Sequence, residues 1–287
     1  MIRAAALALA AAALFTAEVV FVKLLANTVP VTTIMLTRAT AQLVYVSPAF
    51  ARRGTALFRT NRPILHAARG LFSLLSWGFY YWSFQRLDLA TATVLSFTSV
   101  MFVTALARPL LGETVGRRRW SATLAGFAGV VLVAKPFSVA PDPAILLALL
   151  SALSGSGIVL TTKRLSATER TDTIMAYIGL VTFVGSLPIA APTLGVPEPW
   201  QAGWLAAMAA AGPAGMHLWI ASFRHADATV IAPLGYSRLV FAALIGAILF
   251  DEWPDGWMVS GAIVIVGSVL ALTMLEARRG EAAGRRG

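Results

Sequence analysis

Cysteine is absent from this chain of 287 residues. Disulfide frameworks, thiolate nucleophiles and cysteine metal sites are therefore excluded. Charged residues make up only 13% of the chain, whereas roughly a quarter of the residues in a soluble domain are charged. Hydrophobic residues make up 58%, and the mean hydropathy is +0.76. This composition indicates a bundle of membrane-spanning helices rather than a water-soluble core.

Motifs for catalysis or for nucleotide coupling are missing as well. The sequence has no GxxxxGK[ST] phosphate loop, which argues against direct coupling to ATP within this chain. It also has no HExxH motif, no close pair of carboxylates suggests hydrolysis or metal binding, and its three histidines are scattered. We therefore expect no enzymatic activity, no cofactor and no metal.

Ten apolar segments are long enough to cross a membrane. Helices are the default because open sheet edges cannot survive in lipid. The segments run over residues 2–26, 32–51, 63–84, 89–111, 120–136, 143–162, 173–194, 200–223, 228–250 and 257–275. The first segment begins after Arg3 like a signal peptide, but Glu18 and Lys23 interrupt that pattern. We interpret it as the first transmembrane helix.

Lysine and arginine gather in alternate loops. They follow the second, fourth and sixth segments and fill the tail: Arg52, Arg53, Arg59, Arg62; Arg117, Arg118, Arg119; Lys163, Arg164, Arg170; Arg278, Arg279, Arg285, Arg286. The intervening loops hold little beyond Arg86 and Lys135. The positive-inside rule then places both termini in the cytoplasm, in a multi-pass protein of the bacterial inner membrane. This placement explains the net charge of +10 without a nucleic-acid partner.

The chain repeats itself at a constant offset. Residues 222–272 match residues 83–133, and the identical pairs include Ser222 and Ser83, Asp227 and Asp88, Phe241 and Phe102, and Glu252 and Glu113. The copies begin five helices apart, an odd number, so they cross the membrane in opposite directions. The predicted fold is an all-α integral membrane protein of ten transmembrane helices in two inverted repeats, an architecture expected of alternating-access carriers. The repeats cover 1–136 and 137–277, and a basic cytoplasmic tail covers 278–287.

Several local motifs resemble those of a known family. Phe21-Val22-Lys23 and then Arg38 match its first helical pair, and Ala226-Asp227-Ala228-Thr229, Pro233 and Asp251-Glu252 match its second repeat. Gly112-Glu113 closes the first repeat, where Val94 replaces the proline. The chain thus resembles EamA-type ten-helix carriers of the drug/metabolite transporter superfamily over nearly its whole length. It is similar to the YddG-type amino-acid exporters.

This resemblance implies a cavity near the bilayer midplane, lined by helices one to four and six to nine. Helices five and ten would be peripheral scaffold. Some relatives carry S-adenosylmethionine inward, so uptake of that metabolite or of another one is an alternative function.

Ionisable groups inside the membrane are costly, so they mark candidate sites. Glu18 and Arg38 lie at similar depth on neighbouring antiparallel helices, which predicts a structural ion pair. Alternatively, Glu18 is a proton site or an anchor for a substrate ammonium. Lys23 lies nearer the outer end, where we expect it to snorkel to the interface.

One face of the third segment is polar and aromatic. Its residues recur at steps of three and four: His66, Arg69, Ser73, Trp77, Tyr80 and Phe84. Such a face is costly against lipid, so it predicts a cavity wall that binds substrate, although packing between helices is the alternative.

The ninth segment combines Pro233 and Gly235, which loosen a helix and predict a hinge. Tyr236 and Arg238 follow, and Arg238 would either hold a substrate carboxylate or pair with a helix carbonyl end. Ser99 supplies a hydroxyl from the matching region of the first repeat. Together these residues predict one asymmetric substrate site.

Two more residues complete the predicted site. His217 on the eighth segment lies at a depth similar to Arg69, and it is either a hydrogen-bonded packing residue or a proton carrier. Tyr177 on the seventh segment is predicted at the inner mouth of the cavity.

Buried cations outnumber buried acids, with Arg38, Arg69 and Arg238 against Glu18. This balance favours a carboxylate-bearing substrate over cationic drugs. We therefore predict a secondary carrier that exports amino acids or related zwitterions, as a monomer or weak homodimer in the lipid bilayer. An intramembrane enzyme or lipid-handling protein would need a catalytic constellation, and a nucleotide-sugar exchanger would need more clustered lysine and arginine.

Overall fold

The computed structural model describes residues 2–83, 85–99, 101–103, 106, 117–134, 142–166, 168–222, 237–268 and 271. Across these residues the regular secondary structure is helical and contains no strand. The helices are α1 (Ile2–Leu25), α2 (Val31–Arg53), η1 (Gly54–Phe58), α3 (Pro63–Ser83), α4 (Leu89–Ser96), α6 (Arg117–Ala134), α7 (Pro143–Ser166), α8 (Thr171–Ala190), η2 (Ala191–Thr193), α9 (Pro199–Ser222), α11 (Ser237–Phe250) and a helix over Gly256–Ser268.

Each of the ten predicted segments contains helix, and the predicted all-α fold class is confirmed. Most of the described boundaries differ by a few residues, but α4 ends at Ser96, well before the predicted end of its segment at residue 111, and a turn follows it. Helix α2 continues to Arg53 because the next residue, Gly54, adopts a positive φ of 56°, which is open to glycine and ends the helix. Helix α7 continues to Ser166, beyond the predicted end at residue 162.

Three stretches of the described residues are by themselves long and apolar enough to cross a membrane: Ala6–Leu25, Pro143–Thr162 and Thr171–Thr193. Large apolar side chains are exposed on several helices, among them Val44, Leu146, Val184, Leu244 and Ile248. In water such surfaces would drive aggregation, whereas in a bilayer they contact lipid.

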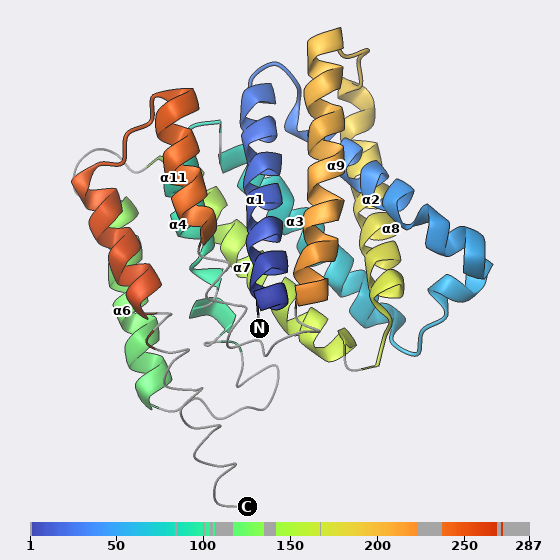
Figure 1. Cartoon of the computed structure of the whole chain (residues 1–287), viewed down its shortest axis with the longest axis horizontal. Helices are drawn as coiled ribbons and strands as arrows, with labels where there is room; N and C mark the ends of the chain where they lie inside the picture. Colours follow the sequence, from blue (N-terminus) through green and yellow to red (C-terminus); the bar gives the residue numbers. More distant parts are fainter. Residues whose placement is uncertain are drawn as a thin grey trace, which may run out of the picture.

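The helices of the two halves interleave. Helix α1 packs on α9, and α3 packs on α7; helix α3 packs on α8, and α2 packs on α9. In Figure 1, α1 lies between α9 and α11, with α3 and α7 behind it. Suppose that α1, α2, α3 and α4 correspond in order to α7, α8, α9 and α11. The α1–α9 contact then corresponds to the α7–α3 contact, the α3–α8 contact to the α9–α2 contact, and the α4–α7 contact to the α11–α1 contact. This exchange is the pattern that an inverted repeat produces.

Helix α6 of the first half and the helix over Gly256–Ser268 of the second half approach each other closely. A Cβ placed on Gly129 of α6 would lie 2.9 Å from the carbonyl oxygen of Gly261 and 2.8 Å from a side-chain carbon of Ile265. Glycine at such a contact lets two helices pack more tightly than larger residues allow. These two helices lie at one edge of the bundle, apart from α1 and α9 (Figure 1).

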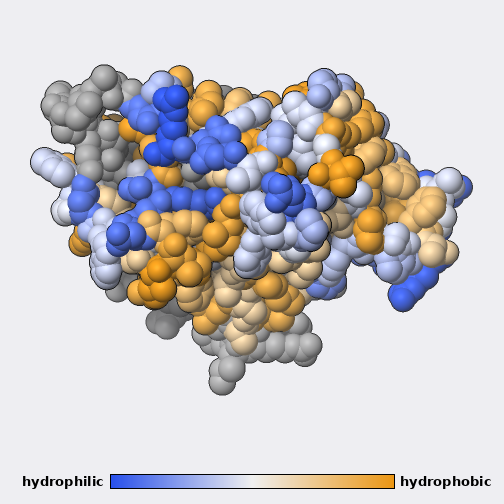
Figure 2. Space-filling model, turned by 90° about the horizontal axis from the view of Figure 1, so that it is seen from above, coloured by the Kyte–Doolittle hydropathy of each residue, from blue (hydrophilic) through white to orange (hydrophobic). Residues whose placement is uncertain are grey.

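The bundle has two ends, which we name from Figure 1. At the upper end α1 finishes and α9 begins, and at the lower end α1 begins and α8 starts. Figure 2 looks onto the upper end, where hydrophilic residues gather over one side and hydrophobic residues lie around the rim. Several exposed tryptophans belong to this end, among them Trp200, Trp253 and Trp257. Such rings are typical of the membrane–water interface.

Candidate substrate-binding site

A buried ion pair lies between the first two helices. Arg38 on α2 donates from Nε to Glu18 on α1, and its Nη2 lies 3.5 Å from the other carboxylate oxygen. Each residue is 3% exposed. A charge buried in this way is tolerated when an opposite charge and hydrogen bonds accompany it. The structure thus brings together two residues that the sequence placed at similar depth.

Aromatic groups surround the pair. The hydroxyl of Tyr81 donates to Glu18 Oε1 at 3.0 Å, and the Arg38 guanidinium carbon lies 3.2 Å from the ring centroid of Trp77. Both rings come from α3, so three helices of the first half meet here. The contact of Arg38 with Trp77 places a cation on a π face, where burial strengthens the attraction.

The second half closes the cluster through α9. A Cβ placed on Gly212 would lie 2.5 Å from Glu18 Oε1. Only glycine therefore lets α9 approach the carboxylate so closely. Sequence reasoning did not single out Tyr81 or Gly212 for this role, because neither lies on a pattern that points to Glu18.

Besides the Thr33 hydroxyl, two buried nitrogen donors on α2 lack a hydrogen-bond partner among the described residues. They are Nη1 of Arg38 and Nε2 of Gln42. The residues are four apart and therefore share one face of the helix. Gln42 is 2% exposed. Buried donors without partners are costly, and a functional site is one reason to keep them. Gln42 is absent from the predicted site, although its i+4 spacing from Arg38 was a usable signal.

The polar face predicted on α3 is largely buried. Arg69 donates from Nε to Thr162 Oγ1 on α7 at 2.6 Å and from Nη1 to Ser73 Oγ. The Tyr80 hydroxyl lies 3.2 Å from Thr93 Oγ1 on α4. Ser99 is half-buried against α7, where a Cβ on Gly155 would lie 3.5 Å away. Arg69 and Tyr80 of this face therefore meet α7 and α4 rather than lipid.

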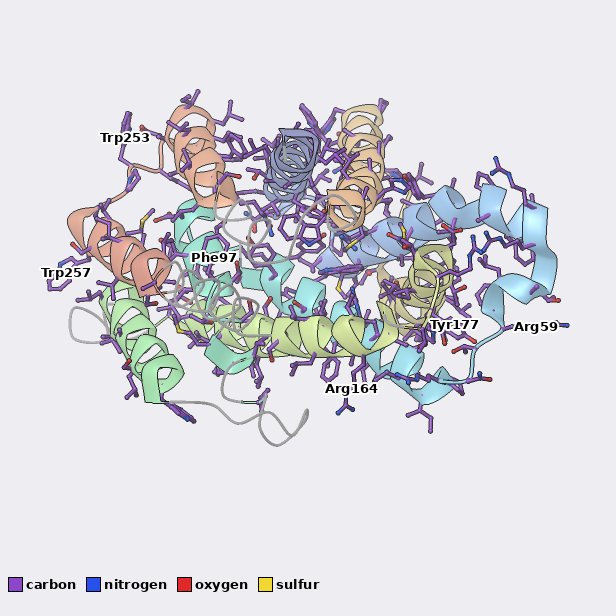
Figure 3. The ribbon with its side chains drawn as sticks, turned by 60° about the horizontal axis from the view of Figure 1, so that its bottom comes forward. Arg59, Phe97, Arg164, Tyr177, Trp253 and Trp257 are labelled. Atoms are coloured by element: carbon purple, nitrogen blue, oxygen red, sulfur yellow. The ribbon has the colours of Figure 1, made fainter. Side chains whose placement is uncertain are left out.

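Tyr177 belongs to a separate cluster at the lower end. Its hydroxyl donates to the Phe58 carbonyl at 2.8 Å, and its ring stacks on His66 with centroids 4.4 Å apart. His66 Nε2 lies 3.8 Å from Glu169 Oε2. Figure 3 shows Tyr177 on the same side of the bundle as Arg59 and Arg164, opposite Trp253 and Trp257.

Arg238 lies near the start of α11 and faces α1. Its guanidinium carbon is 5.4 Å from the ring centroid of Phe15, and its buried Nε has no hydrogen-bond partner among the described residues. Phe15 precedes Glu18 by three residues, so it lies about one turn away on the same face of α1. The predicted hinge at Pro233 and Gly235, together with Tyr236 and Phe84, lies outside the described residues.

His217 stands apart from the residues above. It is exposed, and its ring lies 5.8 Å from that of Tyr45, which is 40% exposed. Tyr45 also borders a groove of about 540 Å³ between α2 and α9, lined by Leu36, Thr37, Thr40, Ala41, Val44, Tyr45, Ala209 and Ala210. This outward-facing groove contains none of the residues predicted to bind substrate. We therefore leave His217 out of the site.

Lys23 has a partner at the upper end that the sequence did not reveal. It forms an ion pair with Glu252 from the second half of the chain. The sequence placed Lys23 near this end of α1, but the partner lies 229 positions away, so no local pattern reveals it.

The profile of the EamA-like transporter family matches this chain twice, over residues 2–135 and 142–274. The chain is 30% identical over 235 residues to the S-adenosylmethionine uptake transporter of Rickettsia prowazekii (strain Madrid E), covering 81% of this chain and 79% of that one. It is 32% identical over 239 residues to the riboflavin transporter of Rhizobium johnstonii, covering 81% and 77%.

Further similarity extends over almost the whole chain. The pseudopaline exporter CntI of Pseudomonas aeruginosa is 28% identical over 269 residues, covering 92% of this chain and 94% of the exporter. One solved crystal structure superposes with a TM-score of 0.59 at 22% identity, covering 95% of this chain and 98% of its own. That likeness shows the fold alone. The family and these relatives are transporters, so the prediction that the chain is not an enzyme is confirmed.

Proposed function

Because the chain belongs to the EamA-like transporter family, whose members carry small molecules across the bacterial inner membrane, we propose that its substrate is a zwitterion with an α-amino acid group. S-Adenosylmethionine is the first candidate. The observation that carries the proposal is a buried acid, Glu18, paired with Arg38. Among the described residues Arg38 Nη1 lacks a hydrogen-bond partner, and so does Nε2 of Gln42, one turn further along α2.

The ion pair suits a substrate with both charges. In the described structure Glu18 and Arg38 neutralise each other. A substrate carboxylate on Arg38 and Gln42, with its ammonium on Glu18, would satisfy the free donors and keep every buried charge matched. A substrate with only an ammonium or only a carboxylate would pair with one of Glu18 and Arg38 and leave the other without a partner at this depth, which is strongly unfavourable. The site therefore discriminates by charge pattern.

The remainder of the substrate would meet aromatic and hydroxyl groups. Trp77 and Tyr81 flank the ion pair, and Tyr80 and Thr93 lie further along α3 and α4. A sulfonium is attracted to π faces, as other cations are. Arg238 supplies a further buried donor beside Phe15. These features support S-adenosylmethionine as the substrate. Free amino acids carry the same α-amino acid group, so the proposed site would recognise them as well.

The relatives differ in direction, since one is an uptake transporter and another an exporter. Our proposal therefore concerns the chemical group that the site recognises and not the direction of transport. Inverted repeats support alternating access, in which rocking of the helices opens each end in turn. The arginines Arg52, Arg53, Arg59, Arg62 and Arg164 lie at or near the lower end, so we place that end and both termini in the cytoplasm.

The decisive experiment measures uptake of labelled S-adenosylmethionine into proteoliposomes and compares competitors that differ by one charge. Methionine has both charges, 3-methylthiopropylamine has only the ammonium, and 4-methylthiobutyrate has only the carboxylate. We expect saturable uptake that methionine reduces and that the two singly charged compounds leave unchanged. Adenosine, which lacks the zwitterion, is the control for recognition of the base.

Substitutions test whether the α-amino acid group is recognised at the site around Glu18, Arg38 and Gln42. We expect Gln42→Leu to weaken competition by methionine about tenfold, since one buried hydrogen bond to a charged group is worth about that factor. Arg86→Gln, at an exposed residue of the upper end, is the matched control. Competition by riboflavin with none by methionine would overturn the proposal in favour of a flavin carrier.

A further inference from the structure

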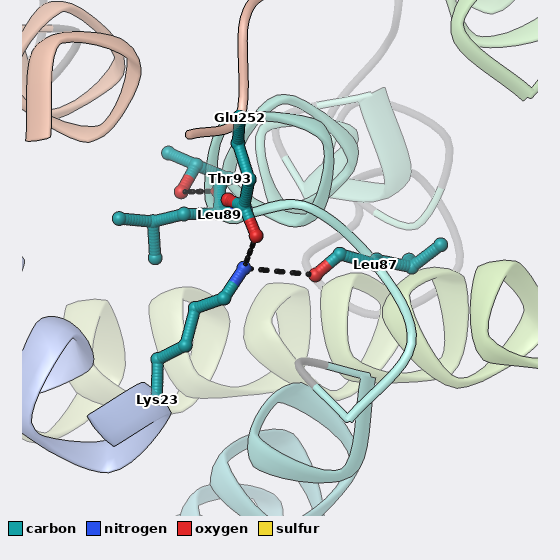
Figure 4. Close-up of polar contacts among 5 residues, drawn as sticks. All are labelled: Lys23, Leu87, Leu89, Thr93 and Glu252. Atoms are coloured by element: carbon teal, nitrogen blue, oxygen red, sulfur yellow. Dashed lines mark hydrogen bonds and ion pairs between the residues drawn. The ribbon is translucent and has the colours of Figure 1, made fainter. Parts of the chain in front are cut away.

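At the upper end a cluster of polar contacts connects three segments (Figure 4). Lys23, near the end of α1, forms an ion pair with Glu252 and also donates to the carbonyl oxygen of Leu87 at 3.4 Å. The other oxygen of Glu252 accepts from the backbone N–H of Leu89 at 2.9 Å, at the start of α4. We call Lys23, Glu252 and the 87–89 backbone the clasp.

The turn after α11 holds Glu252 in place. Asp251 adopts a positive φ of 54°, a conformation that aspartate tolerates better than most residues. The Glu252 N–H then bonds back to the Gly246 carbonyl at 3.0 Å. The carboxylate is thereby aimed at the N-terminus of α4, where backbone N–H groups attract negative charge. Lys23 also lies 5.0 Å from the centroid of the Phe250 ring.

The clasp joins the two halves of the chain. Lys23, Leu87 and Leu89 belong to the first half, and Glu252 belongs to the second. Its side chains are largely buried but less sealed from water than the deep pair, with exposed fractions of 11% for Lys23 and 17% for Glu252 against 4% for Glu18 and Arg38. Water can therefore hydrate both charges when they separate, so opening costs far less than it would for a fully buried pair.

The clasp is also connected to the proposed binding site. Lys23 lies five residues beyond Glu18 on α1. On α4, Thr93 lies one turn below Leu89 and donates to its carbonyl, and the Thr93 oxygen lies 3.2 Å from the Tyr80 hydroxyl. Movement of the start of α4 would thus move a wall of the site.

We propose that Lys23 and Glu252 form the gate of the upper end, closed in the described conformation and opened when the pair separates. This inference rests on the alternating access proposed above. It assigns these two residues a positioning role in the transport cycle, because they hold the ends of α1, α4 and α11 together without touching the substrate.

The test uses the natural absence of cysteine. A reporter, Ser99→Cys, is labelled by a membrane-impermeant maleimide added to the upper side of oriented proteoliposomes. We expect Lys23→Gln and Glu252→Gln each to raise the labelling rate roughly two- to fivefold, the factor expected for a partly exposed pair. Glutamine at 252 still accepts from Leu89, so α4 keeps its cap. The double variant Lys23→Gln/Glu252→Gln should label no faster than either single variant, because each substitution alone already removes the ion pair.

A cross-link supplies a readout within a single preparation. In Lys23→Cys/Glu252→Cys, a short bis-methanethiosulfonate should stop transport, and reductant should restore it. The same treatment of Arg86→Cys/Asp142→Cys, which replaces an exposed pair at 3.9 Å on the same end, should leave transport intact. An unchanged labelling rate in both glutamine variants, or full transport by the cross-linked protein, would overturn the gate. Labelling needs no substrate, so this result is independent of the proposed zwitterion.

Discussion

Helix α1 carries two ion pairs that differ in burial and in what they connect. Glu18 and Arg38 are each 4% exposed at the side chain, and both belong to the first half of the chain. Lys23 and Glu252 are 11% and 17% exposed, and they join the first half to the second. A single helix thus holds one pair shielded from water and another within reach of it.

This difference separates two roles. The deep pair is enclosed by Tyr81, Trp77 and Gly212, so separating its charges requires replacement partners, such as a zwitterionic substrate would supply. The pair near the upper end is able to separate into water, which makes it suited to repeated opening. Variants of each pair should therefore differ in both the size and the kind of their effects.

The largest effect is expected at the deep pair. Arg38→Gln or Glu18→Gln alone leaves an unmatched buried charge and should destabilise the protein by about 3–5 kcal/mol. The double variant should recover most of this stability, yet transport should stay at least roughly 100-fold below the parent. Thermal unfolding in detergent and proteoliposome uptake measure the two properties. Transport restored in the double variant would show that the pair is structural only.

Gly212 offers a smaller perturbation of the same pair. Gly212→Ala places a methyl group 2.5 Å from Glu18 Oε1, so the carboxylate or α9 must shift. We expect transport to fall about tenfold and stability by about 1–3 kcal/mol. Gly203→Ala on the same helix is the control, since no atom lies within 4 Å of its Cβ position. Equal behaviour of the two variants would contradict the close approach of α9 to Glu18.

At the clasp we expect a mild loss of stability and a change in kinetics. Lys23→Gln should alter unfolding by about 1 kcal/mol or less, while transport changes roughly two- to fivefold. Salt should shrink the difference from the parent, because ions screen partly exposed pairs. Uptake at low and high ionic strength measures this. A loss as large as that of Arg38→Gln would place Lys23 in the binding site instead.

The smallest effect is expected at the exposed pair of Arg86 and Asp142, 66% and 38% exposed with 3.9 Å between their charged atoms. Arg86→Gln should change stability by less than about 0.5 kcal/mol and leave transport unchanged. The same unfolding and uptake measurements apply. A clear loss of transport here would mean that any ion pair at the upper end matters, which would weaken the specific role of the clasp.

The candidate site was predictable in part. Glu18 and Arg38 were paired by depth because antiparallel neighbouring helices have a known rise per residue. Gln42 and Tyr81 escaped notice because a polar side chain on a helix does not reveal which neighbour it faces. The side to which His217 points could not be predicted for a similar reason: α9 is apolar around its whole circumference, so no pattern distinguishes its lipid face from its core face.

The sequence by itself determined the helical membrane class, the approximate helix limits and the inverted duplication, since these depend on local hydropathy and on self-similarity along the chain. Only the tertiary structure decided which residues meet. Glu252 reaches Lys23, and Gly212 admits Glu18, across 229 and 194 positions of the chain. Such contacts depend on how the two halves interleave, and that arrangement follows from packing among all the helices rather than from any single segment.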